Sequence, residues 1–350
     1  MALKDKVIRL GFTSFRATGL HRLASPLTRG RGVILMLHHV RPWRPPTPGF
    51  EPNRGLEITP EFLDATLKTA RRAGFEFVTM DEALRRLTQG GAPFAALTFD
   101  DGYRDLRDFA LPILERWQAP FVAYIATGYA GRSARLWWLE LEEAVRRLDR
   151  IEIAAPDFAA ALPSASEKEK AAAFDRLYWR LRDGDEERLL RVIGDLVAQA
   201  KVDGAAMVEQ LCFDWAEIAE LSRHPLATIG AHTVHHRMLA KWPEEAARDE
   251  MAASKAELES ALGREIRHFA YPVGDPTSAG RREFALAREL GFASAVTTRP
   301  GMLFEEHRGH ENALPRLSIS GAWQDVGYLE VLLSGAPFAL WNRGRRLNVA

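Results

Sequence analysis

Three histidines lie within the segment His232-Thr233-Val234-His235-His236, and His232 and His236 are four residues apart. On a helical turn this spacing places two imidazoles on one face, within reach of one metal ion. The pair alone is equally compatible with a structural or solvent-exposed role. The segment therefore indicates a metal site only if a third ligand is found.

Two adjacent acids, Asp100 and Asp101, follow the apolar run AALTF and precede Gly102. Carboxylates at the end of a buried strand are costly unless a cation or hydrogen-bond donors compensate them. Where a strand breaks into a loop, neighbouring side chains can diverge, so one acid can bind a metal while the other faces the water that is activated. The alternative is an Asp-Gly turn followed by a helix N-cap.

Both groups follow segments with the pattern of strands in an α/β domain. Short apolar runs of strand length occupy 33–37, 75–80, 95–102, 120–127, 226–233, 266–274, 293–298 and 314–320. Helical patterns alternate with them, as at 81–87, 214–224 and 243–263. This alternation predicts a mostly parallel sheet with helices outside, either a barrel or an open sheet. Functional groups gather at the carboxyl ends of strands in such folds, so the acids and histidines support each other.

The combination of Thr98-Phe99-Asp100-Asp101-Gly102 with His232-Thr233-x-x-His236 resembles the polysaccharide deacetylases of carbohydrate esterase family 4, which share a nodulation-protein-B-type homology domain. The resemblance covers about residues 33–320. It implies an α/β fold, a distorted (β/α) barrel, with a helical insertion in its middle. It also implies a metal-dependent enzyme that hydrolyses the N-acetyl group of N-acetylhexosamine residues in a glycan or glycan precursor.

The same resemblance implies a role for each matching residue. Asp100 would be the general base, and Asp101, His232 and His236 would hold one divalent metal ion, with Zn²⁺ expected first and other divalent ions as alternatives. Two neutral imidazoles and one carboxylate leave a net positive charge on such an ion and open positions for water and substrate.

The family's third motif commonly carries an arginine, but the corresponding stretch here is Phe269-Ala270-Tyr271-Pro272-Val273-Gly274. Ala270 stands at the arginine position, so the charge that usually orients the base must be absent or replaced. The stretch resembles the branch that includes poly-N-acetylglucosamine deacetylases. In that branch a histidine after the first strand is the catalytic acid, which implies this role for His38, although Leu37 replaces the usual tyrosine before it. A satisfied buried histidine is the alternative.

Weaker candidates for substrate binding are Tyr271, Arg316 and Trp138. Tyr271 is expected to shape the sugar pocket or offer its backbone N–H to an oxyanion, or else to be a rigid strand end before proline. Arg316 is expected to contact Asp100 or substrate, with a surface salt bridge as the competing account. Trp137, Trp138 and Trp215 have the chemistry to stack on sugar rings, although buried aromatics are the commoner outcome.

The chain of 350 residues divides into an expected basic amphipathic segment at 1–32, a barrel domain at 33–336 and a C-terminal tail at 337–350. The helical insertion is expected at about 137–212. The segment at 1–32 places basic residues among apolar ones at roughly helical spacing, so it either packs on the barrel or lies on an anionic membrane as an interfacial helix.

Composition excludes several classes of protein. The chain has 47 basic and 47 acidic residues, which argues against a general nucleic-acid-binding surface, and a single cysteine, Cys212, which excludes an internal disulfide. No run approaches the length of a membrane span, and no secretory signal pattern opens the sequence. We therefore expect a cytoplasmic protein, either free or peripheral at the inner membrane face.

The expected partner is an N-acetylated glycan or a lipid-linked sugar. Two rival functions stay open: a glycan-binding barrel without catalysis, which Ala270 slightly favours, and a metal-dependent amidohydrolase that acts on another carbon–nitrogen amide.

Overall fold

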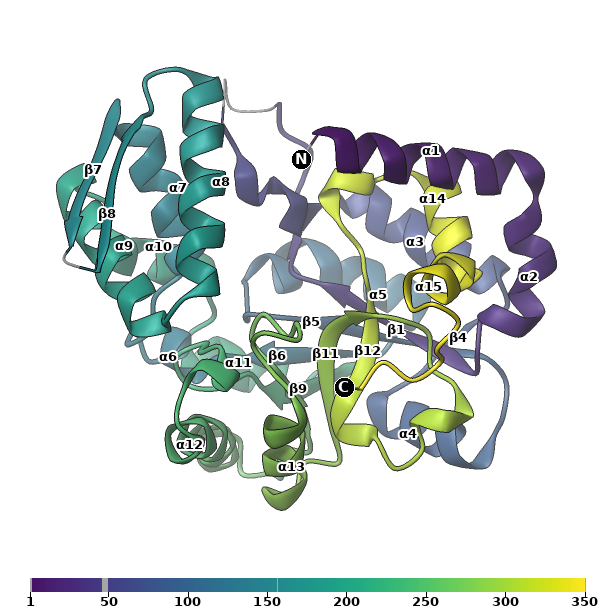
Figure 1. Cartoon of the computed structure of the whole chain (residues 1–350). Helices are drawn as coiled ribbons and strands as arrows, with labels where there is room; N and C mark the ends of the chain where they lie inside the picture. The colour runs from purple at the N-terminus through teal and green to yellow at the C-terminus, as the bar shows by residue number, and fades with distance from the viewer. Residues whose placement is uncertain (1, 46–49, 156, 350) are drawn as a thin grey trace.

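The computed structural model describes residues 2–45, 50–155 and 157–349, with side chains from Arg9 onward, and its centre is a closed barrel of seven parallel strands (Figure 1). The ring runs β1, β12, β11, β10, β9, β6 and β5, and it closes because β5 pairs with β1. These strands are β1 (Gly32–Leu37), β5 (Phe94–Phe99), β6 (Phe121–Ile125), β9 (Ala227–Ala231), β10 (His268–Ala270), β11 (Ser294–Pro300) and β12 (Leu314–Ser318). The predicted (β/α) barrel is confirmed.

Side chains alternate between the barrel interior and the surrounding helices, as strand geometry requires. In β1, Val33 and Leu35 pack in the large outer core, whereas Ile34 belongs to a smaller cluster with Ala270 and Leu314. We assign this smaller cluster to the inside of the barrel. Every residue of β1 and β5 is buried, which explains why both strands are continuous apolar runs.

The outer helices begin at the signals that the sequence offers. In α3, Pro60 is the first residue, and the Thr59 hydroxyl accepts a hydrogen bond from the Phe62 N–H at 3.1 Å. Asp214 and Glu217 form a capping box at the start of α11. The helices around the barrel are α3 (Pro60–Arg72), α4 (Met80–Gln89), α5 (Leu111–Trp117), α11 (Trp215–Leu221), α12 (Glu244–Leu262) and α13 (Arg281–Glu289).

Three strands of two residues each, β4, β2 and β3, lie next to the ring. β4 (Glu76–Phe77) pairs with the first half of β5. The other two, β2 (His39–Val40) and β3 (Glu57–Ile58), pair with each other in parallel directly after the end of β1. This small sheet holds the segment that follows His38.

The region between β6 and α11 forms a separate layer with its own hydrophobic core, at the left in Figure 1. It was expected to be helical throughout, but β7 and β8 form an antiparallel hairpin within it. Ile151 and Ile153 are buried and Glu152 is exposed, an alternation too short to stand out among alanines. The elements are α6 (Thr127–Ala130), α7 (Trp137–Arg147), β7 (Arg150–Ala155), β8 (Phe158–Pro163), α8 (Glu167–Asp183), α9 (Glu186–Ala200) and α10 (Gly204–Leu211).

The two ends of the chain pack together beside the barrel. Helices α1 (Ala2–Thr18) and α2 (Leu20–Thr28) contact α14 (Val326–Leu333) and α15 (Ala336–Trp341). The ring of Phe12 stacks on Tyr328 with centroids 5.1 Å apart, so this side of α1 packs on the protein. Among the described residues, none of the helices has the length and apolar character needed to cross a bilayer.

Candidate metal centre and catalytic site

The chemically important side chains meet at one end of the barrel because all seven strands are parallel. His38 follows β1, the two acids follow β5, and His232 follows β9. Asp100 and His232 each continue the interior-facing alternation of their strands, as does Arg316 within β12. The barrel therefore brings Arg316 into contact with Asp100, although the two residues are 216 positions apart in the sequence.

Asp101, His232 and His236 form a compact buried cluster. The Asp101 Oδ1 lies 3.3 Å from the Nε2 of His232 and 3.2 Å from the Nε2 of His236. One ligand atom from each residue lies within 4.8 Å of the other two. By contrast, His235 turns away and its Nδ1 contacts Glu250 at 2.6 Å. The structure thus brings together the three predicted metal ligands.

The backbone at this cluster adopts a conformation that non-glycine residues rarely take. Asp101, Thr233 and His236 have φ angles of 71°, 63° and 56°. The left-handed region is costly for residues with a Cβ, and most of all for a β-branched residue such as Thr233. At Asp101 it breaks the strand alternation, so that Asp101 and Asp100 face different partners.

Hydrogen bonds and burial prepare the three side chains to bind a cation. His232 donates from Nδ1 to the carbonyl oxygen of Ala270 at 2.6 Å, which leaves Nε2 as the free acceptor nitrogen. Burial lowers the pKa of His236, which favours the neutral imidazole that metals bind. Burial alone would raise the pKa of Asp101, but the two imidazoles hold it well below its usual range, so this side chain is a carboxylate.

Unsatisfied buried atoms support the same conclusion. Asp101 Oδ1 and His236 Nδ1 are buried, and neither has a hydrogen-bond partner of normal geometry among the residues that the structure describes. A carboxylate oxygen without a donor in a buried site is unfavourable unless a cation compensates it. The donor set of one carboxylate and two imidazoles suits a divalent ion such as Zn²⁺.

Asp100 forms a bidentate ion pair with Arg316. The two guanidinium nitrogens donate to the two carboxylate oxygens at 2.7 Å each, and the side chains are 3% and 0% exposed. Arg316 also donates to the carbonyl oxygen of Thr297 and to the hydroxyl of Thr98. Of the sequence-based alternatives, contact with Asp100 is therefore correct and a surface salt bridge is wrong, because the pair is buried.

This ion pair also supplies the charge that is missing at Ala270. Ala270 on β10 and Arg316 on β12 both occupy interior-facing positions, with β11 between the two strands, so the guanidinium reaches Asp100 from β12 instead of β10. Burial would raise the pKa of Asp100, but the guanidinium outweighs this effect and the net shift is downward. Asp100 is thus held as a carboxylate in one orientation.

His38 is partly exposed at the same end of the barrel. Burial lowers its pKa and outweighs the opposing charges of Asp101 and Asp100. The segment after it is fixed by Asp105, which accepts hydrogen bonds from the His39 ring at 2.6 Å, the Val40 N–H at 3.1 Å and Arg41 at 2.8 Å.

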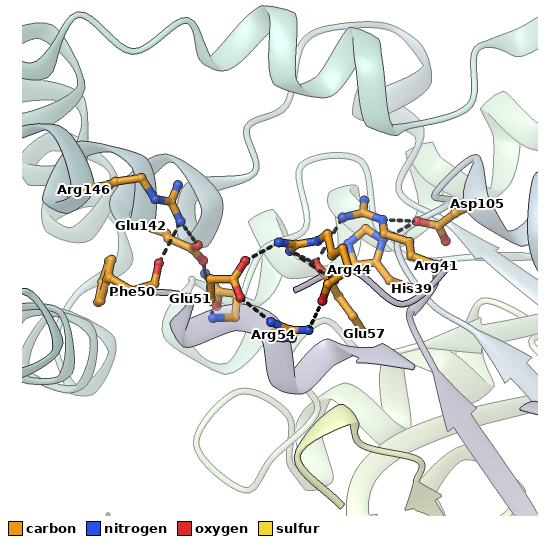
Figure 2. A network of polar contacts seen from close by, with 11 residues as sticks. His39, Arg41, Arg44, Phe50, Glu51, Arg54, Glu57, Asp105, Glu142 and Arg146 are labelled. Carbon is orange, nitrogen blue, oxygen red and sulfur yellow. Dashed lines mark hydrogen bonds and ion pairs between the residues drawn. The ribbon is translucent and has the colours of Figure 1, made fainter. Parts of the chain in front are cut away.

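Figure 2 shows how this anchor continues into a wider polar network. Arg41 bridges Asp105 and Glu57, while Arg44 and Arg54 both pair with Glu51. The network lines a cleft of about 360 Å³ between the β2–β3 segment and helices α7 and α10. Its arginines and glutamates offer both hydrogen-bond donors and acceptors next to His39.

Two predicted substrate contacts are not where the sequence placed them. Tyr271 is fully buried in the outer core, and its hydroxyl donates to the carbonyl oxygen of Asn312 at 2.8 Å. Its backbone N–H already donates to Val296, so an oxyanion role for that N–H is wrong. It follows Ala270 by one residue and therefore points to the opposite side of the strand. Trp215 packs against the same outer core.

Trp138 lies beside the metal cluster, but its ring is not exposed for a sugar to stack on. Its ring centroid is 4.8 Å from that of His236, and Trp137 packs edge-on against it at 5.6 Å. Because Trp138 is buried, the packing supports His236 more directly than it offers a surface for sugar stacking.

Sequence reasoning missed two positioning residues. Asp105 holds the segment after His38, as described above. Glu186, from the insertion, accepts hydrogen bonds from the Met238 N–H at 2.9 Å and the Trp242 indole at 2.6 Å, just after His236. Burial raises the pKa of Glu186 to about 7. Asp105 carried no signal beyond a position near a helix, and Glu186 resembled an ordinary first-turn acid.

Comparisons with known proteins agree with this architecture. A family model described as polysaccharide deacetylase matches residues 88–295, which is more than half of the chain. No curated protein sequence matches.

Solved structures share the fold at low sequence identity. Streptococcus pyogenes deacetylase PplD, in complex with acetate, is 18% identical with a TM-score of 0.54, and the match covers 83% of this chain and 92% of that one. IcaB from Ammonifex degensii is 18% identical with a TM-score of 0.53, covering 87% and 97%. A de-N-acetylase from Aggregatibacter actinomycetemcomitans is 13% identical with a TM-score of 0.51, covering 83% and 96%.

Proposed function

Because the chain belongs to the polysaccharide deacetylase family, and is thus a hydrolase of carbon–nitrogen bonds other than peptide bonds, we propose that it removes the N-acetyl group from N-acetylhexosamine residues of a glycan or glycan precursor. Water adds its oxygen to the acetyl carbon, the carbon–nitrogen bond breaks, and acetate and a free amine are released. The FAYPVG stretch and His38 favour the branch of poly-N-acetylglucosamine deacetylases.

The observation that carries this proposal is the division of labour between the two adjacent acids. Asp101 faces His232 and His236, which together fit a divalent ion, whereas Asp100 faces Arg316. Such an ion supplies Lewis-acid polarisation of an amide carbonyl and makes water more acidic. Zn²⁺ is the ion we propose, because two imidazoles and one carboxylate are a common zinc donor set.

The protein's own residues would move the protons. Asp100, held as a carboxylate by Arg316, accepts a proton from the attacking water. His38, on the partly exposed side, donates a proton to the departing amine nitrogen. The cleft that begins at His39 would hold neighbouring sugar units through its arginines and glutamates. Lipid linkage of the glycan and a cytoplasmic location stay predictions.

Removal of the metal ligands is the direct test of the proposed centre. We expect purified wild-type protein to hold one divalent ion per chain by elemental analysis and to release acetate from N-acetylglucosamine oligomers until a chelator is added. Asp101→Ala and His232→Ala should lose both the ion and the activity, because each removes one of three ligands. His235→Ala is the matched control, since its ring contacts Glu250 instead.

Two outcomes would contradict the proposed centre: metal content that is unchanged in Asp101→Ala and His232→Ala, or acetate release that resists the chelator. Metal binding without acetate release from any N-acetylated glycan would instead favour a binding protein or an amidohydrolase with another substrate.

Loss of the proposed acid should slow catalysis without loss of the metal. For His38→Ala we expect a decrease of roughly 10²- to 10⁴-fold in kcat on N-acetylated oligosaccharides, the usual contribution of a positioned proton donor. Activity on 4-nitrophenyl acetate should change much less, because its phenolate leaves without a proton. Equal losses on both substrates would indicate that His38 is structural and not the acid.

A further inference from the structure

Most of the large apolar side chains that face solvent gather on the helices formed by the two chain ends. Ten such residues are exposed in the part of the chain that the structure describes, and seven of them lie on α1, α2, α14 and α15. On α2 they recur at helical spacing along one side. The seven are Leu10, Leu20, Leu23, Leu27, Val326, Leu340 and Trp341. In Figure 1 these helices lie on the side of the barrel away from the insertion.

An apolar cavity of about 670 Å³ opens among the same helices. Its walls come from α1, α14, α15 and the segment after β12, and they include Phe12, Phe15, Leu329 and Phe338. The exposed residue Trp341 lies at the cavity. An apolar cavity of this size continuous with exposed apolar side chains is the kind of feature that binds a ligand or a partner.

The charges around this surface are strongly biased, although the whole chain is neutral. Residues 9–31 contain five arginines and no acid, and residues 321–349 contain three arginines and two acids. The two acids, Asp325 and Glu330, lie 4.0 and 3.9 Å from Arg16 and Arg22, and both pairs are exposed. Two more acids, Glu305 and Glu306, pair with Arg31 and Arg346 from outside these segments. A basic excess remains.

We propose that this basic apolar face, formed by α1, α2, α14 and α15, docks on a bilayer that contains anionic phospholipids, and that the cavity takes a hydrocarbon chain of such a lipid. Helices that lie in a membrane interface typically expose leucine and tryptophan side chains next to arginines, as this face does. Arginines near the surface add attraction to anionic headgroups. Charge complementarity therefore favours this occupant over an uncharged apolar partner.

The place of the cavity connects docking to the proposed reaction. Ser318, Ile319 and Ser320 line the cavity, and Ser318 is two residues after Arg316 on the same strand. The cavity therefore adjoins the barrel end that carries Asp100 and the metal cluster. The connection to catalysis rests on the proposed function, whereas membrane docking itself does not.

Vesicle co-sedimentation of the full chain tests the docking face. We expect binding to vesicles that contain phosphatidylglycerol, weaker binding to pure phosphatidylcholine, and release by added salt. Leu23→Glu and Trp341→Glu, at residues 78% and 63% exposed, should each lower partitioning about tenfold or more because an inserted side chain becomes a charge. Trp179→Glu on α8, 51% exposed and outside this face, is the matched control.

Folding and catalysis are monitored separately in the same variants. All three should keep the thermal midpoint of wild type and its acetate release from soluble oligosaccharides, so that failure of docking and failure of the deacetylase proposal are distinguishable. The proposal would be overturned if binding did not depend on phosphatidylglycerol. It would also be overturned if Trp179→Glu weakened binding as much as Leu23→Glu does. Binding of a second protein to this face, without any binding of lipid, would also overturn the proposal.

A glycine in the cavity wall allows a test of the chain-binding site. A Cβ at Gly11 would meet no surrounding atom within 4 Å, so Gly11→Phe adds a large side chain at the cavity wall with no clash at its Cβ, and Gly11→Ala is the matched control. We expect the fluorescent fatty acid cis-parinaric acid to bind wild type and Gly11→Ala, and to bind Gly11→Phe at least about tenfold more weakly. Equal affinity for all three proteins would show that the cavity holds no hydrocarbon chain.

Discussion

Asp100→Asn is expected to lower the rate of acetate release by about 10³-fold or more while the protein keeps its metal ion. The amide cannot accept the proton that a general base removes from water, and this step contributes about 10²- to 10⁴-fold. The amide nitrogen would also face a guanidinium that only donates, so the bidentate contact with Arg316 is lost. Because Asp100 faces Arg316 and not the imidazoles, metal content should stay unchanged.

The same substitution one residue later gives the sharpest comparison. Asp101→Asn weakens a ligand and should lower both metal content and turnover. Two isosteric changes at neighbouring positions are then expected to give different signatures in elemental analysis. If Asp100→Asn were as active as wild type, or if it lost the ion, the assignment of base and ligand would be wrong.

Local sequence patterns were sufficient for the barrel strands and for the cluster of ligands. VILML and AALTF could be recognised because both faces of these strands are buried, which makes them continuous apolar runs. The spacing of His232 and His236 correctly paired them, but the segment is a loop with positive φ angles at Thr233 and His236 and not the helical turn that was expected. The parallel barrel brings Asp101 to them. The positive φ angle of Asp101, which separates the directions of the two acids, left no mark in the sequence other than the following Gly102.

Features that depend on distant contacts were harder to predict. The hairpin of β7 and β8 lies in an alanine-rich stretch where helix and strand patterns differ little. Tyr271 was placed near the substrate because its motif contains it, but strand alternation turns it to the outer core. Asp105 and Glu186 act through backbone N–H groups of remote segments, and no spacing rule links them to those segments.

The contact made by Arg316 was also hard to predict from the sequence, although Arg316 is the residue that pairs with the proposed base. Its neighbours in sequence are Pro315 and Leu317, which identify a strand but do not indicate what the guanidinium contacts. Only the closed ring of strands places it opposite Asp100. Once it is there, its substitution is expected to have large effects on both stability and catalysis.

Arg316→Met should lower the free energy of unfolding by about 3–5 kcal/mol, because it leaves Asp100 as a buried carboxylate without a partner. The base would also lose its fixed orientation, so acetate release should fall sharply. Arg316→Lys keeps the charge but cannot form two parallel hydrogen bonds, and it should recover part of both losses. Denaturant unfolding and acetate release measure the two effects on the same preparations.

The double variant Asp100→Leu with Arg316→Met separates stability from catalysis. Removing both charges eliminates the unpaired carboxylate, so stability should return toward that of wild type, as replacement of a buried ion pair by apolar residues often allows. Activity should remain absent because the base is gone. If the double variant were as unstable as Arg316→Met alone, the unpaired charge would not be the cause of the instability. If Arg316→Met itself kept wild-type turnover, Arg316 would not position the base.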